Sequence, residues 1–203
     1  MKDNKEISLF LDTATKALAI GAIFGSEKDY IVLPDPKKAL EMTNLGIEAL
    51  GKRMGFTLSD VDSFYCLLGP GSNTGIRLGL TIPRTIYAFN PNIKIYGIET
   101  LKIFLASGKA FKACLSDRSG NLFFGEMKDG QYSYQKVVKT DISVLDHSDP
   151  IIVEEEDELA SQELFGFSLE KISVIQTMME YYTAFEDFSQ KEEDYLPEYA
   201  LKI

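Results

Sequence analysis

The stretch LLGPGSNTGIRLGL, residues 67–80, has the composition of a ligand-binding loop. A phosphate-binding P-loop needs Gly-x-x-x-x-Gly-Lys-Ser/Thr, so that its amides wrap the phosphates and its lysine reaches the terminal one. Here only three residues separate Gly71 from Gly75, and Ile76 stands where the lysine is needed. The dinucleotide fingerprint fails too, because no third glycine follows Gly69-Pro70-Gly71 at the right offset. An anion could dock at the helix start, but spacing alone favours a tight turn whose glycines let the backbone pack closely.

Other side chains that could do chemistry are scarce. Ser72 would need a nearby base to act as a nucleophile, and the only histidine, His147, stands in the turn-like sequence LDHSDP. A single histidine excludes a metal site built on a histidine pair. Cys66 and Cys114 lie in apolar sequence and are expected to be buried, reduced thiols of a cytoplasmic protein. We therefore predict no metal ligand and no catalytic residue.

The composition is that of an ordinary soluble globular protein. The 203 residues are 45% apolar and 26% charged, and the formal net charge is -10. An excess of carboxylates disfavours tight binding of a nucleic-acid backbone by this chain alone. The sequence has no signal-peptide pattern and no run of about 20 apolar residues that could span a membrane.

The first hundred residues must position the glycine loop. Their apolar runs predict strands at 7–11 and 17–24, joined by the hydroxyl-rich turn Asp12-Thr13-Ala14-Thr15. A helix follows, with Asp35 as N-cap and Pro36 in its first turn, and extends toward Gly55. A buried strand at 64–68, a helix capped by Thr74 and interrupted by Pro83, and a strand at 93–99 complete an α/β lobe over residues 1–100.

Residues 101–203 are predicted to form a second, smaller α/β lobe. A short helix near 100–108 precedes strands that alternate with Asp-Gly and Ser-Gly turns. The charge run VEEEDELA, 153–160, is interpreted as the solvated start of a helix with acids at its positive end. Residues 168–185 predict an amphipathic helix with Ile172, Ile175, Met179 and Tyr182 on one face, which we interpret as core.

Two motifs together resemble the TsaB family, also called YeaZ. The segment LFLDTATKALAIGAI is similar to the family's strand, Asp-Thr-Ser/Thr-Thr turn and second strand. The family's Gly-Pro-Gly-Ser-Phe-Thr-Gly-x-Arg-x-Gly motif is matched at Gly69, Pro70, Gly71, Ser72, Thr74, Gly75, Arg77 and Gly79. The resemblance is clear over residues 7–125 and faint beyond them, although LPEYALK at 196–202 resembles the family's closing Pro-x-Tyr-Leu-Arg.

The departures from the family pattern indicate a divergent member. Asn73 replaces the motif's phenylalanine, and no histidine stands at the start of the 35–55 helix. Ser116 takes the place of an aspartate, and Pro83 interrupts a helix that is usually rich in alanine.

The resemblance implies an α/β fold of the actin, Hsp70 and sugar-kinase (ASKHA) superfamily, with two lobes built on mixed sheets and the second lobe reduced. It also implies a non-catalytic partner subunit in synthesis of the threonylcarbamoyl modification (t6A) of tRNA. The chain would pair with a TsaD-like catalytic subunit and a TsaE-like ATPase. It would contact tRNA only through that complex and could form a homodimer when alone. No cofactor would be bound tightly, although ATP or ADP could sit at the partner interface.

By the same resemblance, helices at 39–50 and 75–88 would form the interface. The expected contact residues are Leu40, Ile47, Thr74, Gly75, Arg77, Leu78, Gly79 and Arg84. The small residues Gly75 and Gly79 would let two helices approach closely. Asp12, Thr13 and Thr15 match the turn that contacts phosphate in ATP-binding relatives, and a structural role for them is favoured because no metal ligands accompany them.

Two other classes of protein stay open. A stand-alone, kinase-like enzyme of the same fold would bind or hydrolyse ATP through the 12–15 turn. A peptidase is disfavoured because the chain has one histidine and no evident metal cluster.

Overall fold

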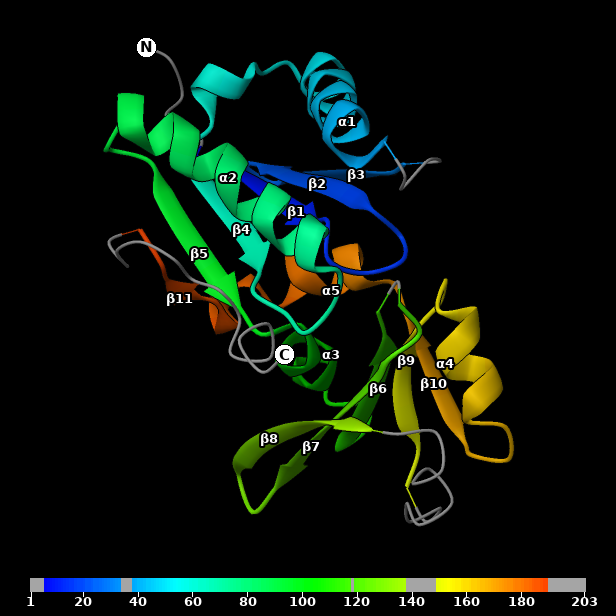
Figure 1. Cartoon of the computed structure of the whole chain (residues 1–203). Helices are drawn as coiled ribbons and strands as arrows, with labels where there is room; N and C mark the ends of the chain where they lie inside the picture. The colour runs from blue at the N-terminus through cyan, green and yellow to red at the C-terminus, as the bar shows by residue number, and fades with distance from the viewer. Residues whose placement is uncertain (1–5, 34–37, 118, 138–148, 190–203) are drawn as a thin grey trace.

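The computed structural model describes residues 6–33, 38–117, 119–137 and 149–189, which form two lobes, each built on a mixed β-sheet (Figure 1). The first sheet has the order β11-β5-β4-β1-β2-β3 and the second β10-β9-β6-β7-β8. The strands are β1 (Ile7–Asp12), β2 (Ala19–Phe24), β3 (Glu27–Val32), β4 (Ser63–Leu67), β5 (Lys94–Ile98), β6 (Lys112–Ser116), β7 (Leu122–Lys128), β8 (Gln131–Val137), β9 (Ile151–Glu154), β10 (Leu169–Ile172) and β11 (Glu186–Asp187). The helices are α1 (Ala39–Met54), α2 (Asn73–Phe89), α3 (Thr100–Ala106), α4 (Glu158–Glu163) and α5 (Val174–Glu180), with 3-10 turns η2 (Leu58–Asp60) and η4 (Tyr182–Ala184).

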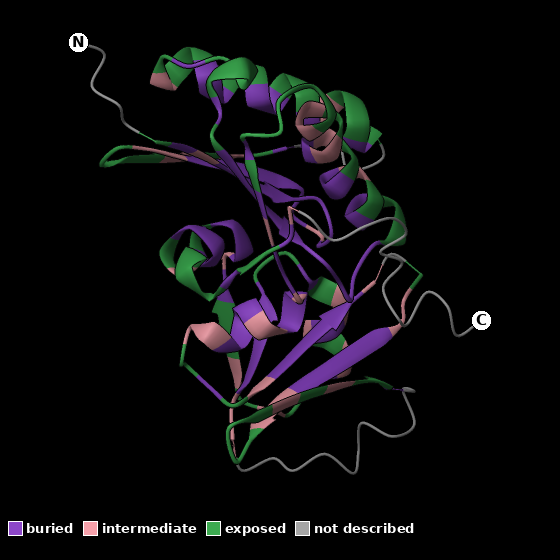
Figure 2. Cartoon of the chain, turned by 90° about the vertical axis from the view of Figure 1, so that its left-hand side faces the viewer, coloured by how far each residue is buried: buried purple, intermediate pink, exposed green. Residues whose placement is uncertain are grey.

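Helices cover both faces of the first sheet. Strands β1, β2 and β3 form an antiparallel meander, while β1, β4 and β5 are parallel to one another. Helix α1 packs on β2 and β3 and α2 on β4 and β5, whereas α5 packs on β1, β2 and β3 from the other side (Figures 1 and 2). Because both faces are covered, β1 is apolar almost throughout, with Leu9, Phe10 and Leu11 fully buried. The strands predicted at 7–11, 17–24 and 64–68 are confirmed, each shifted by one or two residues.

Helix α2 carries Pro83 in its interior, as the sequence predicts. A proline has no backbone N–H, so the carbonyl four residues earlier, that of Gly79, loses its usual helical donor. The thiol of Cys66 on β4 supplies a replacement, with Sγ 3.2 Å from the Gly79 oxygen. The cap differs from the prediction, because the Ser72 side chain, and not that of Thr74, accepts the N–H of Gly75.

The second lobe combines parallel and antiparallel strands. Strands β10, β9 and β6 are parallel, and β6, β7 and β8 form an antiparallel meander. Helix α3 packs on this sheet and on α5, so it lies between the two lobes. Among the residues that the structure describes, none of the helices has the length and apolar character needed to cross a bilayer.

One prediction about the second lobe is wrong, and another is right only in part. The helix predicted over 168–185 is divided into β10, α5 and η4, because residues 169–172 pair with β9 instead of coiling. Ile175 and Met179 are buried as expected, but Tyr182 is 40% exposed. The charge run at 153–160 does contain a helix start, because Asp157 caps α4 and Glu158 lies in its first turn, but the run is not solvated throughout, because Glu154 ends β9 and is 1% exposed.

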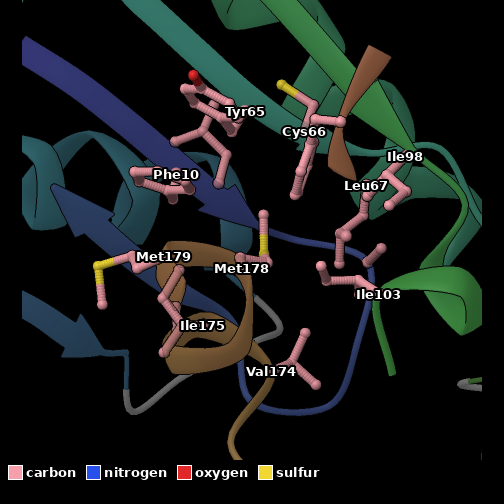
Figure 3. Packing of buried hydrophobic residues seen from close by; sticks show 14 of the residues in the cluster. Phe10, Tyr65, Cys66, Leu67, Ile98, Ile103, Val174, Ile175, Met178 and Met179 are labelled. Atoms are coloured by element: carbon pink, nitrogen blue, oxygen red, sulfur yellow. The ribbon is translucent and has the colours of Figure 1, made fainter. Parts of the chain in front are cut away.

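The chain returns to the first lobe after β10. Helix α5 and strand β11 complete that lobe, and β11 pairs with the edge of β5. Figure 3 shows Ile175, Met178 and Met179 of α5 close to Phe10 and Tyr65 of the first sheet. A division of the chain at residue 100 therefore leaves this returning segment out of the first lobe.

Candidate functional site at the β1–β2 turn

The turn between β1 and β2 holds a carboxylate from the other lobe. The Thr15 hydroxyl lies 2.7 Å from Asp12 Oδ2 and 2.8 Å from Oε1 of Glu154, which ends β9. The backbone amides of Lys16 and Ala17 donate to Glu154 Oε2 at 3.0 Å and to Oε1 at 2.7 Å. Asp12, Thr15 and Glu154 are all at most 3% exposed. The turn thus uses its hydroxyl and two of its amides to hold an internal carboxylate.

Burial makes it costly for both carboxyls to be charged together. Desolvation raises the pKa of Asp12 to about 6, and the hydrogen bonds from the turn oppose part of that rise. Desolvation, followed by the charge of Asp12, raises the pKa of Glu154 to about 8. The two carboxyls therefore favour a state in which at least one of them is protonated.

The glycine loop packs directly against this turn. Thr13 Oγ1 donates to the carbonyl of Gly75 at 2.6 Å, and the Ser72 amide donates to the carbonyl of Ala14 at 2.8 Å. A Cβ at Gly75 would lie 1.7 Å from the Thr13 carbonyl oxygen, and one at Gly71 would lie 2.5 Å from that of Ala14. The prediction that these glycines allow close backbone packing is confirmed, and the partner in that packing is the chain's own turn.

The expected interface residues divide between the inside and the outside of the chain. Ile47, Gly75 and Gly79 are buried, and the space in front of Gly79 is taken by Thr13 Oγ1, 2.6 Å from where its Cβ would be. Exposed or half-buried are Leu40, Thr74, Arg77, Leu78 and Arg84. Gly75 and Gly79 are thus committed to packing within this chain. A role toward a partner remains a prediction for Ile47, which lines a groove at the surface, and for the second group.

A groove that the sequence did not reveal lies between α1 and the end of α2. It has a volume of about 870 Å³, and most of its surface is apolar, although polar side chains such as Glu48 and Lys52 also line it. The apolar part comes from residues that include Ile47, Phe56, Leu58, Ile86 and Phe89. Phe89 is 87% exposed at its rim. In the sequence, only the apolar residues of the first predicted helix, such as Ile47, indicated part of this surface. The residues of η2 and of the end of α2 that complete the groove are distant in the sequence and come together only in the folded chain.

Glu154 and Asp157 are the polar residues of the site that sequence reasoning missed. Asp157 accepts the backbone N–H and the hydroxyl of Ser116, both at 2.6 Å, and caps α4 by accepting the N–H of Ala160. The departure at Ser116 is therefore matched by a hydrogen-bonding partner. Val153, the third apolar residue of β9, precedes Glu154, and this apolar run was the available signal that the acid ends a buried strand.

Within the described ranges, no group of three or more histidine, cysteine or acidic residues could hold a metal ion. His147 and the LPEYALK segment lie outside the described residues.

Sequence comparisons with known proteins give one partial match. No family model matches the chain. An uncharacterized protein of Mycoplasma pneumoniae, an MG208 homolog, is 30% identical over 111 residues, which are 53% of this chain and 57% of that protein. The chain thus spans little more than half the length of this curated relative.

The solved structures match almost the whole chain. YeaZ from Pseudomonas aeruginosa has a TM-score of 0.65 and 16% identity, with 94% of this chain and 100% of that chain covered. A second structure, of an uncharacterized protein with similarity to peptidase YeaZ from the same species, has a TM-score of 0.62 and 17% identity, covering 94% and 99%. The chain has a YeaZ-like fold, and the predicted fold class of two lobes with mixed sheets is confirmed.

Proposed function

We propose that this chain is a non-catalytic, TsaB-like partner subunit of a t6A synthesis complex. It would pair with a TsaD-like catalytic subunit, recruit a TsaE-like ATPase and act in the cytoplasm. The two sequence motifs and the YeaZ-like fold support this assignment. The net charge of -10 supports a subunit that reaches tRNA only through its partner.

The observation that carries the non-catalytic half of the proposal is the position of Glu154. A phosphate at the β1–β2 turn would need the amides of Lys16 and Ala17, which already donate to this carboxylate. Lys16 Nζ donates to the carbonyl of Asp117, 2.9 Å away, and so is not directed at the turn. Binding ATP there would require displacing a buried carboxylate, which disfavours the kinase-like alternative. A nucleotide at the partner interface would rely on donors of the catalytic subunit.

The partner half of the proposal is supported by the outer surface of α1 and α2. Leu40, Leu45 and Phe89 are 61%, 50% and 87% exposed, and the groove beside Phe89 is apolar. Exposed large apolar side chains near an apolar groove are typical of a protein-protein contact. A homodimer formed in isolation would use the same surface.

The test is co-elution of this chain with the TsaD-like protein of its source organism, measured by size-exclusion chromatography with light scattering. We expect a one-to-one pair, weakened about tenfold or more by Phe89→Ser because a large aromatic side chain is lost from the contact. Phe165→Ser is the matched control, since Phe165 is 91% exposed on the second lobe and should leave the pair intact.

Two outcomes would contradict the proposed function. If the wild-type chain forms no pair, the partner assignment is wrong. ATP hydrolysis by the isolated chain would instead favour the kinase-like enzyme. A bulky substitution at Gly75 is unsuitable as an interface test, because it would collide with Thr13 inside the chain.

A further inference from the structure

One hydroxyl group lies between two buried carboxyl groups. Thr15 Oγ1 is within hydrogen-bonding distance of both Asp12 Oδ2, at 2.7 Å, and Glu154 Oε1, at 2.8 Å. A threonine hydroxyl has one proton to donate, and an ionised carboxylate can only accept. If both carboxyls were ionised, one of these close oxygen-oxygen contacts would have no proton in it. The arrangement therefore requires a second proton, held by one of the carboxyls.

The neighbouring charged groups do not provide another neutralising charge. The ammonium of Lys16 donates to a main-chain carbonyl, that of Asp117. The carboxylates of Asp117 and Asp157 accept from their own neighbours, and the charge of Glu156 further raises the pKa of Asp12. Among the described residues, no group of three or more histidine, cysteine or acidic side chains could hold a metal ion in place of the proton.

We propose that Asp12, Thr15 and Glu154 share a proton that fastens the two lobes together, and that releasing this proton loosens the contact. Asp12 ends β1 of the first lobe, and Glu154 ends β9 of the second. Thr15 and Glu154 are 139 positions apart in the sequence, so this is a contact between lobes that only the fold creates. The candidate site at the β1–β2 turn thus contains a proton-dependent latch.

The shared proton stabilises the fold at pH values below the pKa that Glu154 has in the folded chain. Burial raises the pKa of Glu154 from 4.5 to about 8, so the folded chain retains a proton over a pH range in which the unfolded chain has released it. The stabilisation is complete below the unfolded pKa and is lost as pH rises through the folded pKa. A difference of one bound proton changes the folding equilibrium constant by tenfold per pH unit, about 1.4 kcal/mol.

The decisive variant is Asp12→Asn. Its amide N–H would donate to Thr15 Oγ1 in place of the shared proton, and its oxygen would still accept the N–H of Thr15. Thr15 could then donate to Glu154 without a shared proton, and the loss of the Asp12 charge should lower the pKa of Glu154, although burial still raises it. Between pH 6 and 8, we expect wild-type stability in urea unfolding to fall by up to about tenfold in equilibrium constant per pH unit relative to Asp12→Asn. Thr15→Ser keeps the hydroxyl and should keep the wild-type dependence.

A second measurement reports on the hydrogen bonds that the turn donates to Glu154. Amide hydrogen exchange at Lys16 and Ala17, corrected for the intrinsic effect of pH, should accelerate above pH 8 in the wild type and not in Asp12→Asn. Equal pH dependence of the two proteins would overturn the proposal. If Asp12→Asn does not fold, carboxyl ¹³C titration of the wild type decides: one carboxyl still protonated at pH 6 supports the latch, and two ionised carboxyls refute it. Neither measurement involves the partner subunit, so the latch is tested independently of the proposed function.

Discussion

A buried carboxylate needs hydrogen-bond donors, and Glu154 obtains them from the Thr15 hydroxyl and from the amides of Lys16 and Ala17. The acids beside it in sequence have different surroundings, because Glu155 and Glu156 are exposed while Asp157 is buried and caps α4. Composition predicts that such a run is solvated. Which acid enters the interior depends on where β9 ends, and that position follows from its pairing with β6 and β10.

A glycine at position 75 is required by the backbone of the β1–β2 turn. We expect Gly75→Ala to lower the free energy of unfolding by about 3 kcal/mol or more, because the new Cβ would lie 1.7 Å from a carbonyl oxygen that cannot move alone. Urea unfolding followed by circular dichroism measures the change.

The matched control is Gly46→Ala in α1. There the new Cβ would meet the end of the Leu33 side chain at 2.9 Å, which can shift, and alanine is favoured over glycine in a helix by about 1 kcal/mol. This variant should be close to wild type in stability. Equal losses at the two positions would mean that the contact between Gly75 and Thr13 is not decisive.

At the scale of elements, α2 shows how a helix can accommodate an interior proline. Pro83 is buried and leaves the carbonyl of Gly79 without its helical donor, and the Cys66 thiol donates to that carbonyl instead. Burial raises the pKa of Cys66 to about 12, so this group is a neutral thiol that keeps its proton for donation. The helix and the strand beneath it are therefore coupled by this hydrogen bond.

A double-mutant cycle between positions 66 and 83 measures that coupling. Cys66→Ala should cost more in the wild type than in a Pro83→Ala background, because the backbone N–H regained by that substitution can satisfy the carbonyl of Gly79. We expect a coupling free energy of about 0.5–1.5 kcal/mol from urea unfolding of the four proteins. Strict additivity would show that the thiol does not compensate for the proline.

The segment 168–185 shows why helical spacing of apolar residues is not enough to predict a helix. Ile172, Ile175 and Met179 recur at helical spacing and are all buried, but Ile172 belongs to β10. The parallel pairing of β10 with β9 determines where the strand gives way to α5. Periodicity within a segment carries no information about a hydrogen-bonding partner elsewhere in the chain.

At the scale of the whole molecule, the first lobe is completed by residues after 172. Ile175 and Met179 of α5 occupy the space beside Gly21 of β2, and Phe188 donates its N–H to the carbonyl of Ile95 next to β11. About 75 residues separate the end of β5 from the start of α5, where the chain returns to that lobe. So long a connection adds little to the cost of closure, because that cost grows slowly with length.

A fragment of residues 1–100 should therefore fail to fold on its own. Without α5, one face of the first sheet would expose buried side chains such as Phe10. We expect no cooperative thermal transition by circular dichroism and strong binding of a hydrophobic dye, whereas a chain ending at residue 189 keeps α5 and β11 and should melt cooperatively. A cooperative transition in the 1–100 fragment would show that the first lobe is independent of the returning segment.

Residue patterns were sufficient to predict α/β lobes, the central strands β1 and β4 and the close packing at the glycine loop, because apolar runs and glycine spacing are local properties. The mixed sheets were implied by the resemblance of two sequence motifs to a known family. Three features came only from the folded chain: Glu154 fills the β1–β2 turn, Gly75 and Gly79 face Thr13, and α5 returns to the first lobe. These features depend on contacts such as that between Thr15 and Glu154, 139 residues apart. Which donor meets which acceptor over such a separation is fixed by the packing of the two sheets, and no local pattern encodes it.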